Sequence, residues 1–167
     1  MKYTIIFIFA LVLSLGFAWI IRAEDEQGES KAALALKNRA TAPKDSDMDK
    51  AVSIDSMLQA KKESDLAQTK AAKVDAFVVQ VEREDDGDYH LALASAEHEP
   101  NSTKWVIAEV TPGWQKKDKS LSGPQLKELY GKKVEVSGWL YYEPEENQPD
   151  PRGTRWEIHP VTSIVTK

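Results

Sequence analysis

Residues 122–131, SGPQLKELYG, decide between the folds that the rest of the sequence allows. Ser122 is a residue type that caps helix N-termini, Pro124 fits a first helical turn, and Gly131 is suited to ending a helix. The stretch from Ser122 to Tyr130 therefore predicts one short helix. Its position carries the information, because the segments on both sides of it have the pattern of β-strands.

Three strand-like segments precede this helix and two follow it. Apolar and polar residues alternate with period two at residues 73–81, 89–96, 104–110, 133–142 and 155–165. The acidic stretch Glu84–Asp88 contains Gly87 and predicts a turn between the first two strands. Pro160 cannot donate a hydrogen bond to a neighbouring strand, so it predicts an edge or a bulge in the last strand.

Three strands, one helix and two strands are the element order of the OB-fold. The sequence therefore predicts a mostly β domain, a small five-stranded OB-like barrel with one short helix between strands 3 and 4. Gly138 lies where the fourth strand of such a barrel has to bend. An SH3-like barrel and a small β-sandwich are the alternatives, and the position of the helix favours the OB order.

The N-terminus predicts export. Lys2 precedes an apolar run that ends at Ile21 and Arg22, which fits either a cleaved signal peptide or a membrane anchor. We therefore divide the chain into a signal or anchor at residues 1–22, a linker at 23–72 and the barrel domain at 73–167. The expected location is outside the cytoplasm, periplasmic or attached to the membrane.

The predicted linker at residues 23–72 is of low complexity, with no aromatic side chain and few branched aliphatic ones. Residues 46–70 have some helical character, which suits a solvated spacer helix or a helix that binds a partner's groove.

Residues 1–72 hold ten basic and ten acidic residues, so the net charge of −5 belongs to the barrel domain. An acidic domain is a poor match to a phosphate backbone, and nucleic acid is expected to be a disfavoured partner. The chain has no cysteine, which excludes disulfides and thiol chemistry.

Two short motifs carry a resemblance to a family. Asp86–Leu93, with its D-x-H-L pattern, and Trp156–Val161, WEIHPV, occur together with Gly138, Trp139 and Leu140. In order and spacing they resemble a group of uncharacterised bacterial exported proteins built on one small OB-like barrel. The resemblance covers the barrel domain, and it implies this fold and export rather than an activity. Relatives tend to have a longer, more polar or histidine-containing connection after the fourth strand, whereas residues 143–154 hold no histidine here.

Both motifs contain a histidine beside acidic residues. His90 and His159, with Asp88 or Glu157, have the ligand types of a catalytic zinc or iron site, or of an acid/base centre that positions a water. Alternatively these residues are structural: Asp88 caps the turn, His90 binds a backbone carbonyl and His159 braces a bulge at Pro160. The first strand of an OB-like barrel lies between the second and the fourth, so the histidines are expected to meet only near an end or across the barrel mouth.

Aromatic residues predict a second kind of site. Trp139 and Tyr141 share the non-core face of the fourth strand, and OB-folds use such side chains to stack bases or sugars. Alternatively, the aromatic residues are packed core, as is common in a domain this small. We therefore expect an exported, envelope-associated binding module that recognises an envelope ligand or a protein partner through Trp139, Tyr141 and His90. No cofactor is expected in that case. The alternative is a metal-assisted hydrolase that uses His90, His159 and Glu157 with zinc.

Overall fold

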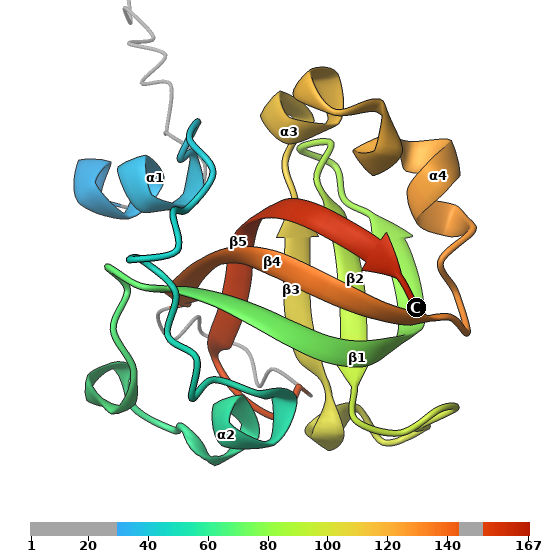
Figure 1. The fold of residues 1–167 in the computed structure, drawn as a ribbon, viewed down its shortest axis with the longest axis horizontal. Helices are drawn as coiled ribbons and strands as arrows, with labels where there is room; N and C mark the ends of the chain where they lie inside the picture. Colours follow the sequence, from blue (N-terminus) through green and yellow to red (C-terminus); the bar gives the residue numbers. More distant parts are fainter. Residues whose placement is uncertain (1–29, 144–151) are drawn as a thin grey trace, which may run out of the picture.

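The computed structural model describes residues 30–143 and 152–167 (Figure 1). The strands close into one barrel in the order β1-β2-β3-β5-β4, and all neighbours are antiparallel except β3 and β5. The strands are β1 (Ala71–Arg83), β2 (Tyr89–Ala94), β3 (Val106–Val110), β4 (Lys133–Tyr142) and β5 (Trp156–Thr166). The predicted fold class, a five-stranded OB-like barrel, is confirmed.

The connection between β3 and β4 holds the predicted helix. This helix, α4 (Gly123–Lys127), follows Ser122 and has its proline in the first turn. Two further helical segments precede it, α3 (Pro112–Lys117) and the 3-10 turn η4 (Lys119–Leu121). The remaining short 3-10 turns are η2 (Glu63–Asp65) and η3 (Ser102–Lys104).

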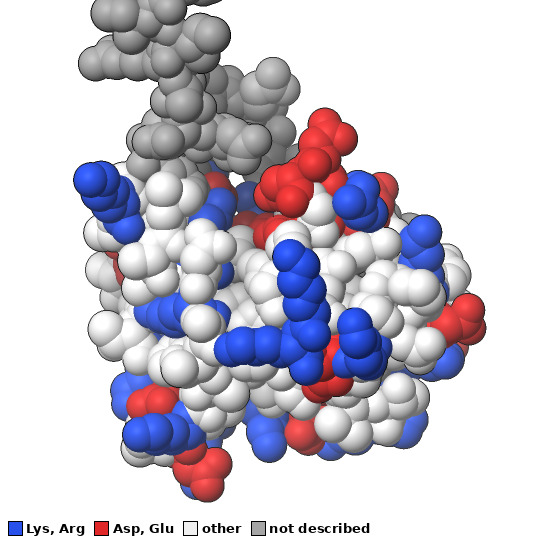
Figure 2. Space-filling view, turned by 90° about the horizontal axis from the view of Figure 1, so that it is seen from above, with Lys and Arg blue, Asp and Glu red and all other residues white. Residues whose placement is uncertain are grey.

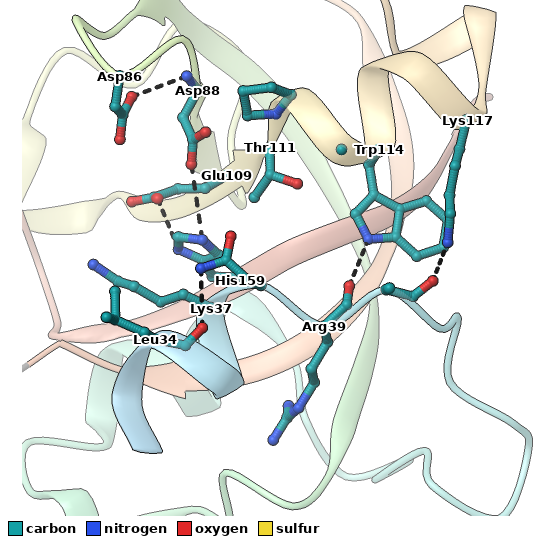
Figure 3. A pocket seen from close by; sticks show the side chains of 14 residues that line it. Leu34, Lys37, Arg39, Asp86, Asp88, Glu109, Thr111, Trp114, Lys117 and His159 are labelled. Carbon is teal, nitrogen blue, oxygen red and sulfur yellow. Dashed lines mark hydrogen bonds and ion pairs between the residues drawn. The ribbon is translucent and has the colours of Figure 1, made fainter. Parts of the chain in front are cut away.

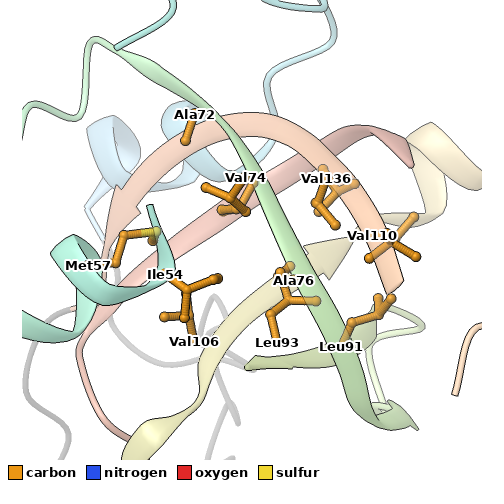
Figure 4. Close-up of a cluster of buried hydrophobic side chains, with 14 of the residues drawn as sticks. Ile54, Met57, Ala72, Val74, Ala76, Leu91, Leu93, Val106, Val110 and Val136 are labelled. Atoms are coloured by element: carbon orange, nitrogen blue, oxygen red, sulfur yellow. The ribbon is translucent and has the colours of Figure 1, made fainter. Parts of the chain in front are cut away.

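The barrel interior is filled by one face of every strand. Figure 4 shows the inward side chains of β1, β2, β3 and β4 converging on the barrel axis. Gly138 of β4 lies where the register with β5 shifts, and a Cβ there would approach the Pro160 carbonyl oxygen to 2.5 Å. Glycine is therefore required at the bend, and the irregularity predicted at Pro160 is a bulge within a closed barrel.

Part of the predicted linker closes one end of the barrel. Helix α2 (Ile54–Gln59) is shorter than the helical stretch that the sequence suggested. Ile54 and Met57 point into the barrel end in Figure 4, and both are buried with Val52 and Ala60. Four residues of the predicted linker, namely Val52, Ile54, Met57 and Ala60, thus belong to the core.

Helix α1 (Lys31–Lys37) lies beside the barrel near β4 and β5, at the end opposite α2 (Figure 1). It contributes no buried side chain. Among residues 30–143 and 152–167, no helix is long and apolar enough to cross a membrane. The apolar run that predicts a signal or anchor lies outside the described residues.

Candidate functional site

The strand order joins the two motif histidines through β3. His90 of β2 is paired in register with Glu109 of β3, and Ala108 of β3 is paired with Ile158 of β5. Because alternate residues of a strand face opposite sides, His90, Glu109 and His159 all lie on the outer wall of the barrel. β1 does separate β2 from β4, as expected, but the histidines meet across β3 on the outer wall rather than at the mouth.

The Glu109 carboxylate contacts the imidazoles of both His90 and His159. Its Oε1 lies 3.1 Å from Nε2 of His90, and its Oε2 lies 2.7 Å from Nδ1 of His159. His159 Nδ1 is also 3.5 Å from Oε2 of Glu157, and its Nε2 is 3.8 Å from Oδ2 of Asp88. Figure 3 shows the Asp88, Glu109 and His159 side chains pointing toward one another. His159, at 3% exposure, and Glu157, at 1%, are almost fully buried.

This geometry makes His159 an imidazolium. Burial opposes its charge, but the Glu109 carboxylate and the nearby Glu157 outweigh burial and raise the pKa of His159 to about 10. Burial lowers the pKa of His90, but its hydrogen bond to Glu109 and the charges of Glu109, Glu157 and Glu84 together outweigh burial and raise it. Burial would raise the pKa of Glu109, yet the His159 charge holds it well below the usual range.

Two other acids near this group hold their protons more tightly than usual. Burial, with the neighbouring Asp86 carboxylate, raises the pKa of Asp88 to about 6. Burial, with the Glu157 charge, raises the pKa of Glu143 to about 7, although Lys37 lies 3.2 Å from its Oε2. At these two acids, burial and the neighbouring carboxylates together outweigh the nearby positive charges.

A cavity of about 420 Å³ lies in front of this wall. Asp88, Glu109 and His159 form one side of it, and the segment from Leu34 to Ala40, with Trp114, forms the other (Figure 3). Viewed from this end of the molecule, Figure 2 shows a group of acidic side chains next to a broad spread of Lys and Arg side chains. The cavity thus lies between the outer wall with Asp88 and Glu109, which we call the acidic wall, and the basic residues Arg39 and Lys117, which we call the rim.

Two tryptophans fasten the segment that covers the cavity. The indole Nε1 of Trp114 donates to the Arg39 carbonyl, and that of Trp139 donates to the Thr41 carbonyl, both at 2.9 Å. The guanidinium of Arg39 lies over the Trp139 ring, 4.4 Å from its centroid. We call residues 31–41 the cover segment. It is held by indole and backbone contacts rather than by burial of its own side chains.

The residues predicted from the sequence as site residues lie in different surroundings in the structure. His90, His159, Glu157 and Asp88 are brought together around Glu109. Tyr141, predicted for ligand stacking, is 1% exposed, and its ring meets His159 edge-on with centroids 5.8 Å apart. Trp139 lies under the cover segment. Both aromatic residues therefore support the polar group and its cover in this conformation.

Glu109 is the residue that the sequence reasoning missed. It lies in the third strand, Val106–Val110, where it interrupts an otherwise apolar run. A charged residue inside a buried strand needs a partner, so this position was a signal that could have been used. The partner could not be identified, because the parallel pairing of β3 with β5 follows from tertiary topology.

No family model and no curated protein matches this chain. Among solved structures, asparaginyl-tRNA synthetase from Entamoeba histolytica is similar at a TM-score of 0.43 and 13% identity, over 61% of this chain and 21% of that one. Its complex with asparaginyl-adenylate gives a TM-score of 0.42 and 12% identity, over 63% and 22%. A Leishmania major Friedlin protein described as an aspartyl-tRNA synthetase gives 0.40 and 17%, over 81% and 25%.

These comparisons correct the expectation about partners. Nucleic acid was expected to be disfavoured and an envelope ligand or protein to be the partner, whereas the similar structures are tRNA synthetases. The expectation was wrong in relying on net charge alone, which describes a whole domain and not one face of it. The chain spans a quarter or less of the length of these synthetases, and matches of this extent transfer no partner to it. The chain has an OB-type barrel, an architecture used for ligand binding.

Proposed function

We propose that the chain is an OB-type binding module whose outer-wall cavity takes a compact cationic ligand, either an organic amine or a metal ion. The observation that carries this proposal is the cluster of carboxylates at the acidic wall, in which burial raises the pKa of Asp88 to about 6. The carboxylates are Asp88, Glu109, Glu143 and Glu157, and the basic side chains paired with them are Lys37, Arg152, His90 and His159.

The basic residues of the rim are engaged elsewhere. Arg39 donates to the Gln68 carbonyl and stacks on Trp139, and Lys117 donates to the Ala40 carbonyl. Neither is paired with a carboxylate of the acidic wall among the described contacts. A cation entering the cavity would meet the carboxylates of Asp86, Asp88 and Glu109, which line it.

Protons supply the missing positive charge when the cavity is empty. The pKa values of His159, Asp88 and Glu143 are all raised, to about 10, 6 and 7. A buried carboxylate is costly unless it is paired or protonated. Asp88 lines the cavity, and a cation bound beside it would take the place of its proton, which supports a cationic ligand over a neutral one.

Calorimetric titration of the full chain tests the proposal, with spermidine, Zn²⁺ and total tRNA as separate probes. We expect at least one of the two cations to bind, and Asp88→Asn to weaken that binding at least tenfold. The matched control is Asp85→Asn, an exposed acid on the same turn, which should leave the affinity unchanged. Binding of tRNA alone, insensitive to Asp88→Asn, would contradict a cation site.

We also propose that the module acts outside the cytoplasm, as in the exported bacterial family that its motifs resemble. The basic Lys2 followed by an apolar run to Ile21 supports this location. Alkaline phosphatase fused after Lys167 should be active in a bacterial host, because its disulfides form only after export. Deletion of residues 2–22 should abolish that activity, and an equally active deletion would contradict export through this segment.

A further inference from the structure

We infer that the outside of the barrel carries a binding site for an arginine-containing peptide, and that the cover segment occupies this site from within the same chain. The site goes beyond the proposed cation cavity. It is formed by Trp114 and Lys117 of α3 and by Trp139 of β4, which hold residues 39–41. The partner class is a segment of another polypeptide that presents an arginine in the same way and displaces the cover segment.

Three consecutive backbone carbonyls of the cover segment accept hydrogen bonds from side chains of the barrel domain. The donors are the indoles of Trp114 and Trp139 and the ammonium of Lys117, and the acceptors are, in the same order, the carbonyls of Arg39, Thr41 and Ala40. Figure 3 shows Trp114 and Lys117 directed at this backbone. Residues 39–41 belong to no helix or strand, so their carbonyls need such donors. These contacts recognise a peptide backbone whatever its sequence.

The side chain of Arg39 occupies a pocket that fits a guanidinium. Its Cζ lies 4.4 Å from the centroid of the Trp139 ring, and its Nη2 donates to the Gln68 carbonyl at 2.6 Å. A guanidinium suits this combination, because it stacks on aromatic rings and presents its donors in a rigid fork. Gln68 is itself fixed, since its side chain accepts from the backbone N–H of Tyr142. The pocket therefore gives the site a preference for arginine.

The cover segment is held weakly enough to be displaced. Every residue from Lys31 to Thr41 is exposed or half-buried, so no apolar side chain anchors the segment in the core. Nη1 of Arg39 is buried and has no hydrogen-bond partner among the described residues, so occupation by the cover segment leaves one donor unsatisfied. An intramolecular ligand acts at an effective concentration of about 1 mM, at which a weak contact suffices to keep it bound. A peptide with a better contact in the same pocket would therefore replace it.

Fluorescence anisotropy of a labelled peptide with the sequence of residues 30–43 tests the inference on the full chain in mild detergent. The Arg39→Ala chain, whose own segment lacks the arginine, should bind this peptide about fivefold more tightly than the wild type does. Lys31→Ala, which changes an exposed basic residue of the same segment, is the matched control and should bind as the wild type does. Replacing the arginine of the peptide by alanine or lysine should weaken its binding to the Arg39→Ala chain about tenfold.

Removal of one indole donor locates the bound peptide. In the Arg39→Ala chain, Trp139→Phe keeps an aromatic ring but loses the N–H, and it should weaken peptide binding. Trp105→Phe is the matched control, because the Trp105 indole donates to the Glu99 carbonyl instead, and it should leave the affinity unchanged. Peptide binding that is insensitive to Trp139→Phe, or to loss of the arginine of the peptide, overturns the inference.

Hydrogen exchange of the wild-type chain decides the case if Arg39→Ala does not fold. An excess of the unlabelled peptide should speed exchange of the backbone amides of residues 31–41, because a helix as short as α1 is not stable once it is detached. Amides that exchange at the same rate with and without the peptide overturn the inference. Faster exchange with a single-stranded oligonucleotide but not with the peptide would assign the surface to nucleic acid, and it overturns the inference as well.

Discussion

At the scale of single residues, the outer wall depends on Glu109. It is 6% exposed, and it pairs with an imidazole on each of its two oxygens. His159 is buried and His90 is partly exposed, and without this carboxylate both imidazoles would lose their nearest negative charge. Glu109 therefore stabilises the charge state of the whole group, whichever ligand the cavity takes.

Glu109→Gln should accordingly destabilise the fold. Removing one partner of a buried ion pair costs about 3 to 5 kcal/mol in the free energy of unfolding. Urea unfolding followed by tryptophan fluorescence measures the change. Glu97→Gln is the matched control, because Glu97 forms an exposed pair with His98 at 3.2 Å and should unfold as the wild type does. Equal stability of the two variants would mean that the Glu109 contacts are energetically unimportant.

The pKa of His159 gives the stability a pH dependence. The folded pKa of about 10 lies above the unfolded value of 6.5, so the folded state binds the proton more tightly. The stabilisation is fully present below about pH 6.5 and is lost as the pH rises through about 10. Asp88 and Glu143 act in the same direction, at about pH 4 to 7, because their folded pKa values are also raised.

We therefore expect the urea midpoint of the wild type to fall from pH 6.5 to pH 10. His159→Asn should flatten this fall, whereas His98→Asn, whose histidine is exposed, should leave it unchanged. A midpoint that stays constant over this range in the wild type would show that His159 does not gain a proton on folding.

At the scale of elements, α2 contributes more to the barrel than its length suggests. Met57 is fully buried and reaches into the barrel end beside Ile54 (Figure 4). Figure 1 shows α2 covering the end of the barrel that lies away from α1 and α3. Helix propensity in six residues is insufficient for a stable helix, so tertiary packing of these side chains holds it in place.

Met57→Ala should therefore cost about 2 to 5 kcal/mol in the free energy of unfolding, the range for a buried methionine truncated to alanine. Chemical denaturation of the two proteins measures it. Leu36→Ala in α1 is the control, since no side chain of α1 is buried, and its cost should be much smaller. A cost for Met57→Ala no greater than that of the control would contradict a core role for α2.

At the scale of the whole molecule, sequence periodicity was sufficient to predict the barrel. It was insufficient to predict α2 and the cover segment, which pack against the barrel. The strands and α4 follow from local alternation and turn residues, so they could be predicted. The contacts of α2 and the cover segment depend on single apolar or indole side chains, such as Met57 and Trp139, which have no periodic signature. The histidines were found because they are rare, but their link through Glu109 required the β3 and β5 pairing.

The same distinction predicts how truncations behave. Removing residues 1–41 deletes the cover segment, whose side chains are not buried, so the barrel should still unfold cooperatively at nearly the wild-type urea concentration. Removing residues 1–60 also deletes four core side chains, those of Val52, Ile54, Met57 and Ala60, and should abolish cooperative unfolding. Denaturation followed by near-UV circular dichroism distinguishes the two. If the shorter truncation already unfolds the barrel, the cover segment contributes to stability through its backbone contacts with Trp114 and Trp139, and opening of the cavity would then require partial unfolding.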